Sequence, residues 1–179
     1  MNIEEKLDQL INFGASAIDH LDGSLIKHLK GTYTLLKQWN ADIALCIAGA
    51  YHAVYGTSGF DKTLISEKNR KTIKDIIGTE AEQIVYTYCA CDRDFFWPQI
   101  GTQTNPLFLD RFTDSKYHLS INELQFFCEL TVANELEIAT DNIKFIKEYG
   151  ESLQDLLSRM TPYISIQANN HIKTIFGSI

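Results

Sequence analysis

The chain has 179 residues, of which 45% are apolar and 22% are charged, and its formal net charge is -7 at pH 7. This length and composition predict one compact domain over residues 1–179 that buries its core without disulfide staples. The negative charge and the lack of a long lysine or arginine run argue against nucleic acid as a partner, because phosphate binding needs a basic surface. Anionic small molecules stay open as ligands through a local pocket.

The sequence also argues against a membrane or secreted protein. The N-terminal segment MNIEEKLDQLINF carries acidic residues and lacks the basic start and long apolar run of a signal peptide. No stretch approaches the roughly 20 apolar residues of a membrane helix. The four cysteines are scattered through predicted helices, as is typical of reduced thiols packed as small apolar groups. We therefore expect a cytoplasmic protein with no membrane partner, and a homodimer stays open.

Apolar periodicity and capping residues predict helices along the first half of the chain. Ser24 is expected to cap the second helix, and glycine at position 78 to stop the fourth. Thr79 and Glu82 have the spacing of a capping box for the fifth. The predicted helices run from Ile3 to Phe13, from Ser24 to Trp39, from Asn40 or Asp42 to His52, from Ser66 to Gly78 and from Thr79 to about Phe95.

The second half is predicted to be a long connection followed by helices. The connection, over residues 97–117, contains prolines, a glycine and many polar residues, and is long enough to form a lid or a pocket wall. Ser120 and Glu123 form a second capping box. No segment alternates with a period of two, so a sheet is not expected and the predicted class is all-α. The C-terminal helices, within residues 120–175, run from Ser120 to about Tyr149 and from Ser152 to Ile175 with a break at Pro162.

Three polar residues fall on the core-facing stripes of three predicted helices. They are His28 on the second helix, His52 on the third and Asp92 on the fifth. An ionisable group on such a stripe needs a partner, because leaving it buried and unpaired costs on the order of several kcal/mol. A shared metal ion would be one such partner.

Two stretches around these residues follow a known pattern. AGAYHAVYGT contains His52, and GTEAEQIVYTYCACDR ends with Asp92 and Arg93. Together with His28 they resemble the HD superfamily of metal-dependent phosphohydrolases, most closely the hydrolase domain of the bacterial alarmone enzymes. The resemblance is strongest over residues 20–95. It implies an HD-like helical bundle in which His28, His52 and Asp92 bind a divalent Mn, Fe, Ni or Zn ion.

One position departs from the family pattern. Ala53 stands where the family has the aspartate of its His-Asp pair, which is a central metal ligand. The remaining three residues still match sites with two histidines, one carboxylate and an open position, although we expect weaker binding. His20 is a candidate fourth ligand, because a turn at Gly23 would bring it near.

The resemblance implies hydrolysis of a phosphorylated small molecule or nucleotide. A bound metal would lower the pKa of a water and polarise a phosphoryl oxygen. We count three residues as candidate catalytic groups. Arg93 would receive negative charge, Tyr55 opens a loop whose N–H groups could bind an anion, and Glu82 is a nearby carboxylate.

Other interpretations stay open. An iron-dependent oxygenase of the HD-like branch would need spare carboxylates, for which Glu82, Glu129 and Glu135 are candidates. A non-catalytic ligand-binding or interaction module would have kept the fold and lost the metal chemistry. Arg93 could simply pair with its neighbour Asp92. The aromatic run over residues 95–97 either lines a pocket for a ring-bearing ligand or packs between helices, which is the commoner outcome.

Overall fold

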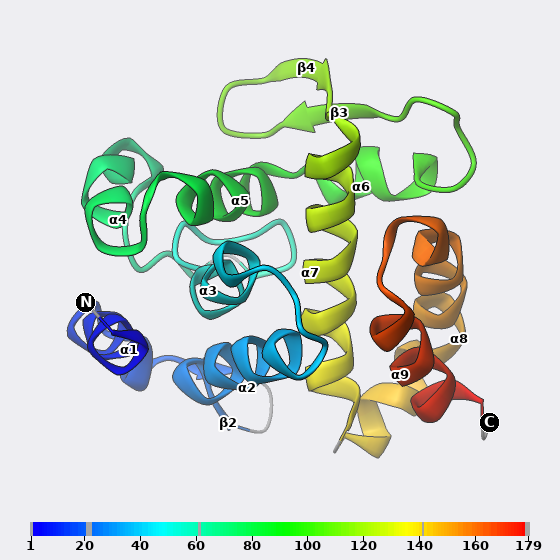
Figure 1. Cartoon of the computed structure of the whole chain (residues 1–179), viewed down its shortest axis with the longest axis horizontal. Helices are drawn as coiled ribbons and strands as arrows, with labels where there is room; N and C mark the ends of the chain where they lie inside the picture. Colours follow the sequence, from blue (N-terminus) through cyan, green and yellow to red (C-terminus); the bar gives the residue numbers. More distant parts are fainter. Residues whose placement is uncertain (1, 21–22, 61, 141, 178–179) are drawn as a thin grey trace. The chain divides into compact units, whose positions relative to one another are not determined.

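A computed structural model of the chain describes residues 2–20, 23–60, 62–140 and 142–177. The protein is mainly helical, as the periodicity predicts (Figure 1). Its internal contacts divide it into two compact units, Met1–Cys91 and Asp92–Ile179. The expectation of a single domain therefore stays a prediction. Within the described residues, no helix is both long and apolar enough to cross a membrane.

The first unit consists of helices, two 3-10 turns and a small hairpin. In chain order they are α1 (Ile3–Asn12), η1 (Ala15–Ala17), β1 (Asp19–His20), β2 (Gly23–Ser24), α2 (Leu25–Gln38), α3 (Ile43–Tyr51), η2 (Glu67–Asn69), α4 (Arg70–Ile77) and α5 (Thr79–Ala90). α2 packs along α3, and α5 packs on α3 and α4 (Figure 1). The core of this unit therefore lies around α3, which is buried along nearly its whole length.

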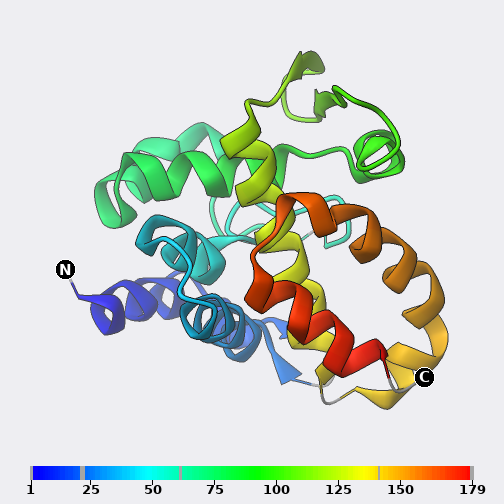
Figure 2. The ribbon, with the colours of Figure 1, turned by 45° about the vertical axis from the view of Figure 1, so that its right-hand side comes forward.

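The second unit begins with a short helix and a hairpin and ends with three longer helices. Its elements are α6 (Arg93–Phe96), η3 (Trp97–Gln99), β3 (Leu107–Asp110), β4 (Ser115–His118), α7 (Ile121–Thr140), α8 (Ile143–Met160), η4 (Thr161–Tyr163) and α9 (Ile166–Phe176). α8 and α9 both pack against α7. Figure 2 shows α7 in yellow, α8 in orange and α9 in red. α7 is accordingly buried over most of its length.

Local capping chemistry explains several helix starts. Asp42 accepts a hydrogen bond from the N–H of Ala44 at 2.7 Å. The capping box of Ser120 and Glu123 is formed in both directions. Gly78 ends α4 at a φ of 90°, a left-handed conformation that favours glycine. Ser24 is the N-cap of α2, but its side chain makes no capping hydrogen bond.

The predicted fifth helix is wrong in both its cap and its end. Thr79 lies inside α5, and the N-cap is Gly78. The helix ends at Ala90, because Cys91 is extended, with φ -65° and ψ 121°. Asp92 then caps a separate helix, α6, by accepting from the N–H of Phe95 at 2.9 Å. Asp92 is therefore not on the inward stripe of α5.

Two expectations for the second half are also wrong. An antiparallel hairpin, β3 and β4, occupies the end of the predicted connection and runs one residue beyond it, so that Leu107 pairs with His118. The helix from Ser120 ends at Thr140, and Asn142 starts α8 by accepting from the N–H of Phe145 at 2.9 Å. The break at Pro162 is confirmed, since η4 separates α8 from α9. The hairpin lacks a period-two signal because both strands are short and β4 is exposed on both faces.

Candidate functional site

His28 and His52 meet inside the first unit. Their Nε2 atoms lie 3.2 Å apart, and the rings stand at 84° with their centroids 5.0 Å apart. Only 6% of His28 and 2% of His52 is exposed. His28 comes from the inward face of α2, and His52 is the residue that ends α3. The prediction that both lie on inward faces is confirmed.

Contacts around His52 fix its ring. Its Nδ1 lies 2.8 Å from the carbonyl oxygen of Gly49, one turn earlier. Because a carbonyl can only accept, Nδ1 carries the proton, and the neutral ring then presents a lone pair at Nε2. The ring makes a T-shaped contact with Tyr88, with the centroids 5.6 Å apart. The Cys89 thiol donates to the carbonyl oxygen of His52 at 3.0 Å.

The two Nε2 atoms suit a shared partner. Nitrogens that bind one tetrahedral zinc ion at about 2.0–2.1 Å lie about 3.3–3.4 Å apart, close to the observed 3.2 Å. A proton shared between the rings fits the same distance. Among the described residues, however, no group of three or more His, Cys, Asp and Glu side chains has the geometry of a metal site. The pair thus provides two ligands where a catalytic metal commonly has three protein ligands.

The other predicted ligands are not part of this pair. Ala53 is buried, with 3% exposure, and places a methyl group where the resemblance expects a carboxylate. Asp92 belongs to the second unit, where its side chain caps α6. The side chain of His20 lies outside the described part of the chain, so this candidate is not placed.

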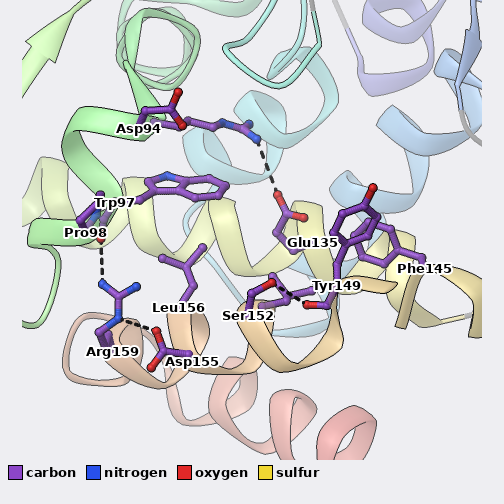
Figure 3. Close-up of a pocket in the computed structure, with 12 residues that line it drawn as sticks. Asp94, Trp97, Pro98, Glu135, Phe145, Tyr149, Ser152, Asp155, Leu156 and Arg159 are labelled. Carbon is purple, nitrogen blue, oxygen red and sulfur yellow. Dashed lines mark hydrogen bonds and ion pairs between the residues drawn. The ribbon is translucent and has the colours of Figure 1, made fainter. Parts of the chain in front are cut away.

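Arg93 lies in the second unit beside Glu135 and Trp97. Its Nη1 is 3.8 Å from the Glu135 carboxylate, and its guanidinium carbon is 4.8 Å from the centroid of the Trp97 ring. Asn134 donates to the same carboxylate at 2.9 Å. These residues line a pocket against α8, seen in close-up in Figure 3. The sequence indicates this region through Arg93, Glu135, the aromatic run and the predicted pocket wall that starts at Trp97, but it does not indicate the contribution of α8.

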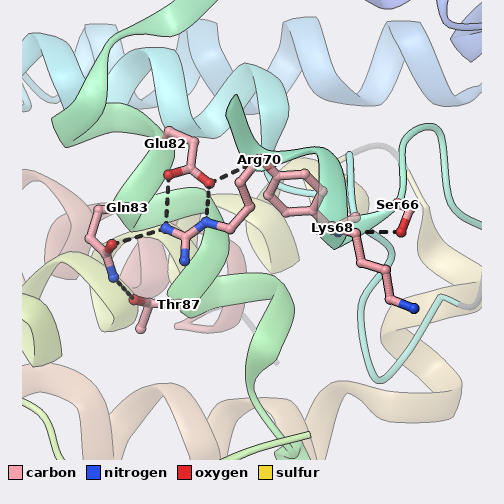
Figure 4. A network of polar contacts seen from close by, with 7 residues as sticks. Ser66, Lys68, Arg70, Glu82, Gln83 and Thr87 are labelled. Atoms are coloured by element: carbon pink, nitrogen blue, oxygen red, sulfur yellow. Dashed lines mark hydrogen bonds and ion pairs between the residues drawn. The ribbon is translucent and has the colours of Figure 1, made fainter. Parts of the chain in front are cut away.

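Tyr55 and Glu82 come together in a buried polar network of the first unit (Figure 4 shows Glu82 with Arg70). The Tyr55 hydroxyl donates to Glu82 at 3.0 Å. Arg70 donates to both oxygens of the same carboxylate, at 2.7 and 2.8 Å, and its guanidinium lies 3.7 Å from the Tyr86 ring centroid. The sequence did not identify Arg70, because its partner comes from a different helix.

The electrostatics of this network favour a structural role for Tyr55. Burial, and then the charge and hydrogen bond of Glu82, raise the pKa of Tyr55 far above its ordinary value. Burial would lower the pKa of Arg70, but the hydrogen bond and charge of Glu82 raise it. Tyr55 thus stays protonated as a donor, and the carboxylate of Glu82 stays paired.

The loop after Tyr55 forms an ordinary turn. The N–H of Gly56 donates to the carbonyl of Ala53 at 2.9 Å, and the N–H of Thr57 donates to that of Phe60 at 2.9 Å. Gly56 has a φ of 73°, which favours glycine. These N–H groups already have backbone acceptors, so the structure favours the turn over anion binding.

Comparison with known proteins identifies one matching segment. Residues 9–93 match the family profile of a domain of unknown function, DUF6817. No curated protein and no solved structure matches the chain. The matching segment contains the histidine pair, Ala53 and Glu82, and it covers nearly the same residues as the resemblance to the HD superfamily.

Proposed function

We propose that the first unit is a divergent HD-like helical domain whose His28–His52 pair binds a divalent cation. We further propose that the protein hydrolyses a phosphorylated small molecule or nucleotide. The observation that carries the proposal is the 3.2 Å separation of two buried Nε2 atoms. A divalent metal, when bound, would lower the pKa of a coordinated water and polarise a phosphoryl oxygen.

The surroundings of His52 support a ligand role. Metal-bound histidines commonly donate their second N–H to a carbonyl or carboxylate, which fixes the ring and its tautomer. His52 has this arrangement through the Gly49 carbonyl, and Tyr88 limits rotation of its ring. A histidine that only packs in the core also needs a hydrogen-bond partner. A second buried imidazole 3.2 Å away is an unusual partner, because protonation of both rings would place two positive charges together.

Completion of the site is the open requirement of this proposal. Three protein ligands are the common minimum for a catalytic metal. His20, which a turn at Gly23 would bring near in the chain, stays the proposed additional ligand. With Ala53 in place of the family's aspartate, we propose one metal ion and not two.

Elemental analysis and cobalt binding test the metal site directly. The full chain, purified without chelators, should contain close to one equivalent of Mn, Fe, Ni or Zn, or take up one equivalent of Co²⁺ with the visible absorption of a nitrogen-ligated ion. His28→Gln and His52→Gln should each lose this binding. His118→Gln is the matched control, because His118 is an exposed histidine on β4 and should leave binding unchanged.

Phosphate release tests the activity. The metal-loaded chain should release phosphate or pyrophosphate from nucleotides or from p-nitrophenyl phosphate, and His52→Gln should reduce the rate at least about 100-fold. If the chain binds metal but releases no phosphate, the proposed cation site stands and the proposed hydrolase activity is refuted. A chain that takes up none of these metals under anaerobic conditions would refute both parts.

A non-catalytic ligand-binding module is the second candidate, and the burial of Ala53 favours it. Ala53 is only 3% exposed, so a methyl group without metal-binding atoms is buried where the resemblance expects a carboxylate. The oxygenase alternative has less support, because its spare carboxylates are occupied. Glu82 pairs with Arg70, Glu129 accepts two bonds from Ser165, and Glu135 accepts from Asn134.

A further inference from the structure

The second unit contains a pocket that the proposed hydrolase does not use. Its cavity volume is about 600 Å³, within the range of about 300–1,000 Å³ that is typical of small-molecule sites. The segment from α6 to η3 forms one wall, α7 contributes Glu135, and α8 forms the opposite wall (Figure 3). Every lining residue belongs to the second unit.

Aromatic and aliphatic side chains form most of the pocket surface. Trp97 stands on one side, and Phe145 and Tyr149 stand on the other, as Figure 3 shows. The rings of Phe145 and Tyr149 lie 5.2 Å apart at 46°. Leu156 lies between Trp97 and the backbone of α8. Flat aromatic faces on two sides favour a planar ligand, because offset and edge-to-face ring contacts add to simple burial.

Trp97 carries a donor that the described protein atoms do not satisfy. Its indole N–H is buried and has no hydrogen-bond partner within the described part of the chain. A buried donor without an acceptor costs about 1–3 kcal/mol. A ligand with an acceptor atom at its ring edge would remove this cost once the indole turned its N–H toward the pocket.

The charges of the pocket argue against an anionic ligand. Its lining includes three carboxylates, on Asp94, Glu135 and Asp155, and two guanidinium groups, on Arg93 and Arg159. Both guanidinium groups already face carboxylates, at 3.8 Å for Arg93 and Glu135 and 3.1 Å for Arg159 and Asp155. A phosphorylated molecule would have to compete with these carboxylates, whereas an uncharged ring would not.

The backbone that carries Trp97 is held in place before any ligand binds. Arg159 donates through Nη1 to the carbonyl of Trp97 at 2.8 Å and to that of Ile100 at 3.0 Å. Gly101 approaches the end of α8 so closely that a Cβ there would lie 2.6 Å from the carbonyl oxygen of Arg159. These contacts tie η3 to α8 and fix the pocket width. A preformed pocket of this kind loses little free energy to ordering when a ligand binds.

We propose that this pocket binds an uncharged, planar heteroaromatic molecule. The ligand lies against Trp97 and Leu156, with Phe145 and Tyr149 on its other side. A ring nitrogen or carbonyl oxygen at its edge accepts the hydrogen bond of the Trp97 indole. This site is separate from the histidine pair in its residues, and its occupation does not require a metal.

Quinoline is the probe for the test, studied at pH 8, where its ring nitrogen is unprotonated. In a ¹⁵N–¹H spectrum of the full chain, the indole resonance of Trp97 should move with quinoline concentration and saturate. The indole resonance of Trp39, which lies in the first unit, is the internal reference and should stay in place. Naphthalene, which has the same ring size without an acceptor, should bind more weakly.

Two variants complete the test, with binding followed at the backbone amide of Leu156. Trp97→Phe keeps an aromatic wall and removes the donor, so quinoline should bind about 3–10-fold more weakly while naphthalene changes little. Ser152→Phe fills the pocket from α8 and should abolish binding of both. Absence of a saturable Trp97 shift, tighter binding of naphthalene-2-carboxylate than of quinoline, or equal losses for both probes in Trp97→Phe would overturn the proposal.

Discussion

Arg70 and Glu82 form a two-point ion pair in the first unit. The guanidinium Nε donates to one carboxylate oxygen at 2.7 Å, and Nη2 donates to the other at 2.8 Å. The Glu82 side chain is 0% exposed, while that of Arg70 is 30% exposed. The pair joins α4 to α5, and Tyr55 links it to the loop after α3. A carboxylate this deeply buried depends on its donors, because an unpaired buried charge is strongly destabilising.

Removal of the Arg70 guanidinium should therefore destabilise the first unit. We expect Arg70→Met to lower the free energy of unfolding by about 3 kcal/mol, at the low end for a broken buried pair because Arg70 is partly exposed. Urea denaturation at pH 7 measures the change. The control is Lys71→Met, since Lys71 pairs with Asp75 on the surface of the same helix and should show little change. Equal losses for both variants would contradict the structural role of Arg70.

Tyr55 should make stability depend on pH in the alkaline range. Its pKa is raised by burial and by Glu82, so the folded chain keeps the phenol proton where the unfolded chain releases it. The contribution of the protonated Tyr55 to the free energy of unfolding is thus fully present below a pH of about 10 and is lost as the pH rises further. Above this pH, wild-type stability should fall more steeply than that of Tyr55→Phe, by up to about 1.4 kcal/mol per pH unit. Tyr33→Phe should keep the wild-type slope, and an unchanged slope in Tyr55→Phe would refute the prediction.

Ser165 should stabilise the start of α9 through two hydrogen bonds of its hydroxyl group. Its hydroxyl accepts from the N–H of Ala168 at 3.1 Å and donates to the buried Glu129 carboxylate at 2.6 Å. Ser165→Ala removes both, and we expect a loss of about 2 kcal/mol in unfolding free energy. Ser165→Thr should restore most of it. Ser120→Ala, at an exposed cap on α7, should lower the free energy of unfolding by less than Ser165→Ala does. Thermal unfolding of the three variants measures these differences.

Gly101 should tolerate substitution less well than another left-handed glycine. Its φ is 73°, and an added Cβ would meet the Arg159 carbonyl oxygen at 2.6 Å. Gly14 has a φ of 94°, but an added Cβ there meets nothing within 4 Å. Gly14→Ala thus measures backbone strain alone, of about 1–2 kcal/mol. We expect Gly101→Ala to cost at least twice as much in chemical denaturation and to weaken quinoline binding. Equal costs would show that η3 and α8 separate easily.

Parts of the candidate site were predictable because they depend on local periodicity. His28 falls on the stripe of α2 that includes Leu25, Leu29 and Leu36, and all four are buried. The sequence misplaces Asp92 because its helical pattern continues past Cys91, whereas the backbone turns to an extended conformation there and a new helix begins. The pattern likewise joins α7 to part of α8, although Asn142 caps a separate helix.

The sequence by itself determined the mainly helical class, the inward faces of His28 and His52, and the cap at Ser120, and it limited the start of α3 to Asn40 or Asp42. These features depend on residues within about one or two helical turns of each other. Only the tertiary structure decided that the two Nε2 atoms lie 3.2 Å apart, that Glu82 pairs with Arg70, and that α8 closes a pocket beside Trp97. Such contacts join side chains far apart in the chain. Their geometry follows from how whole helices pack, which no local pattern encodes.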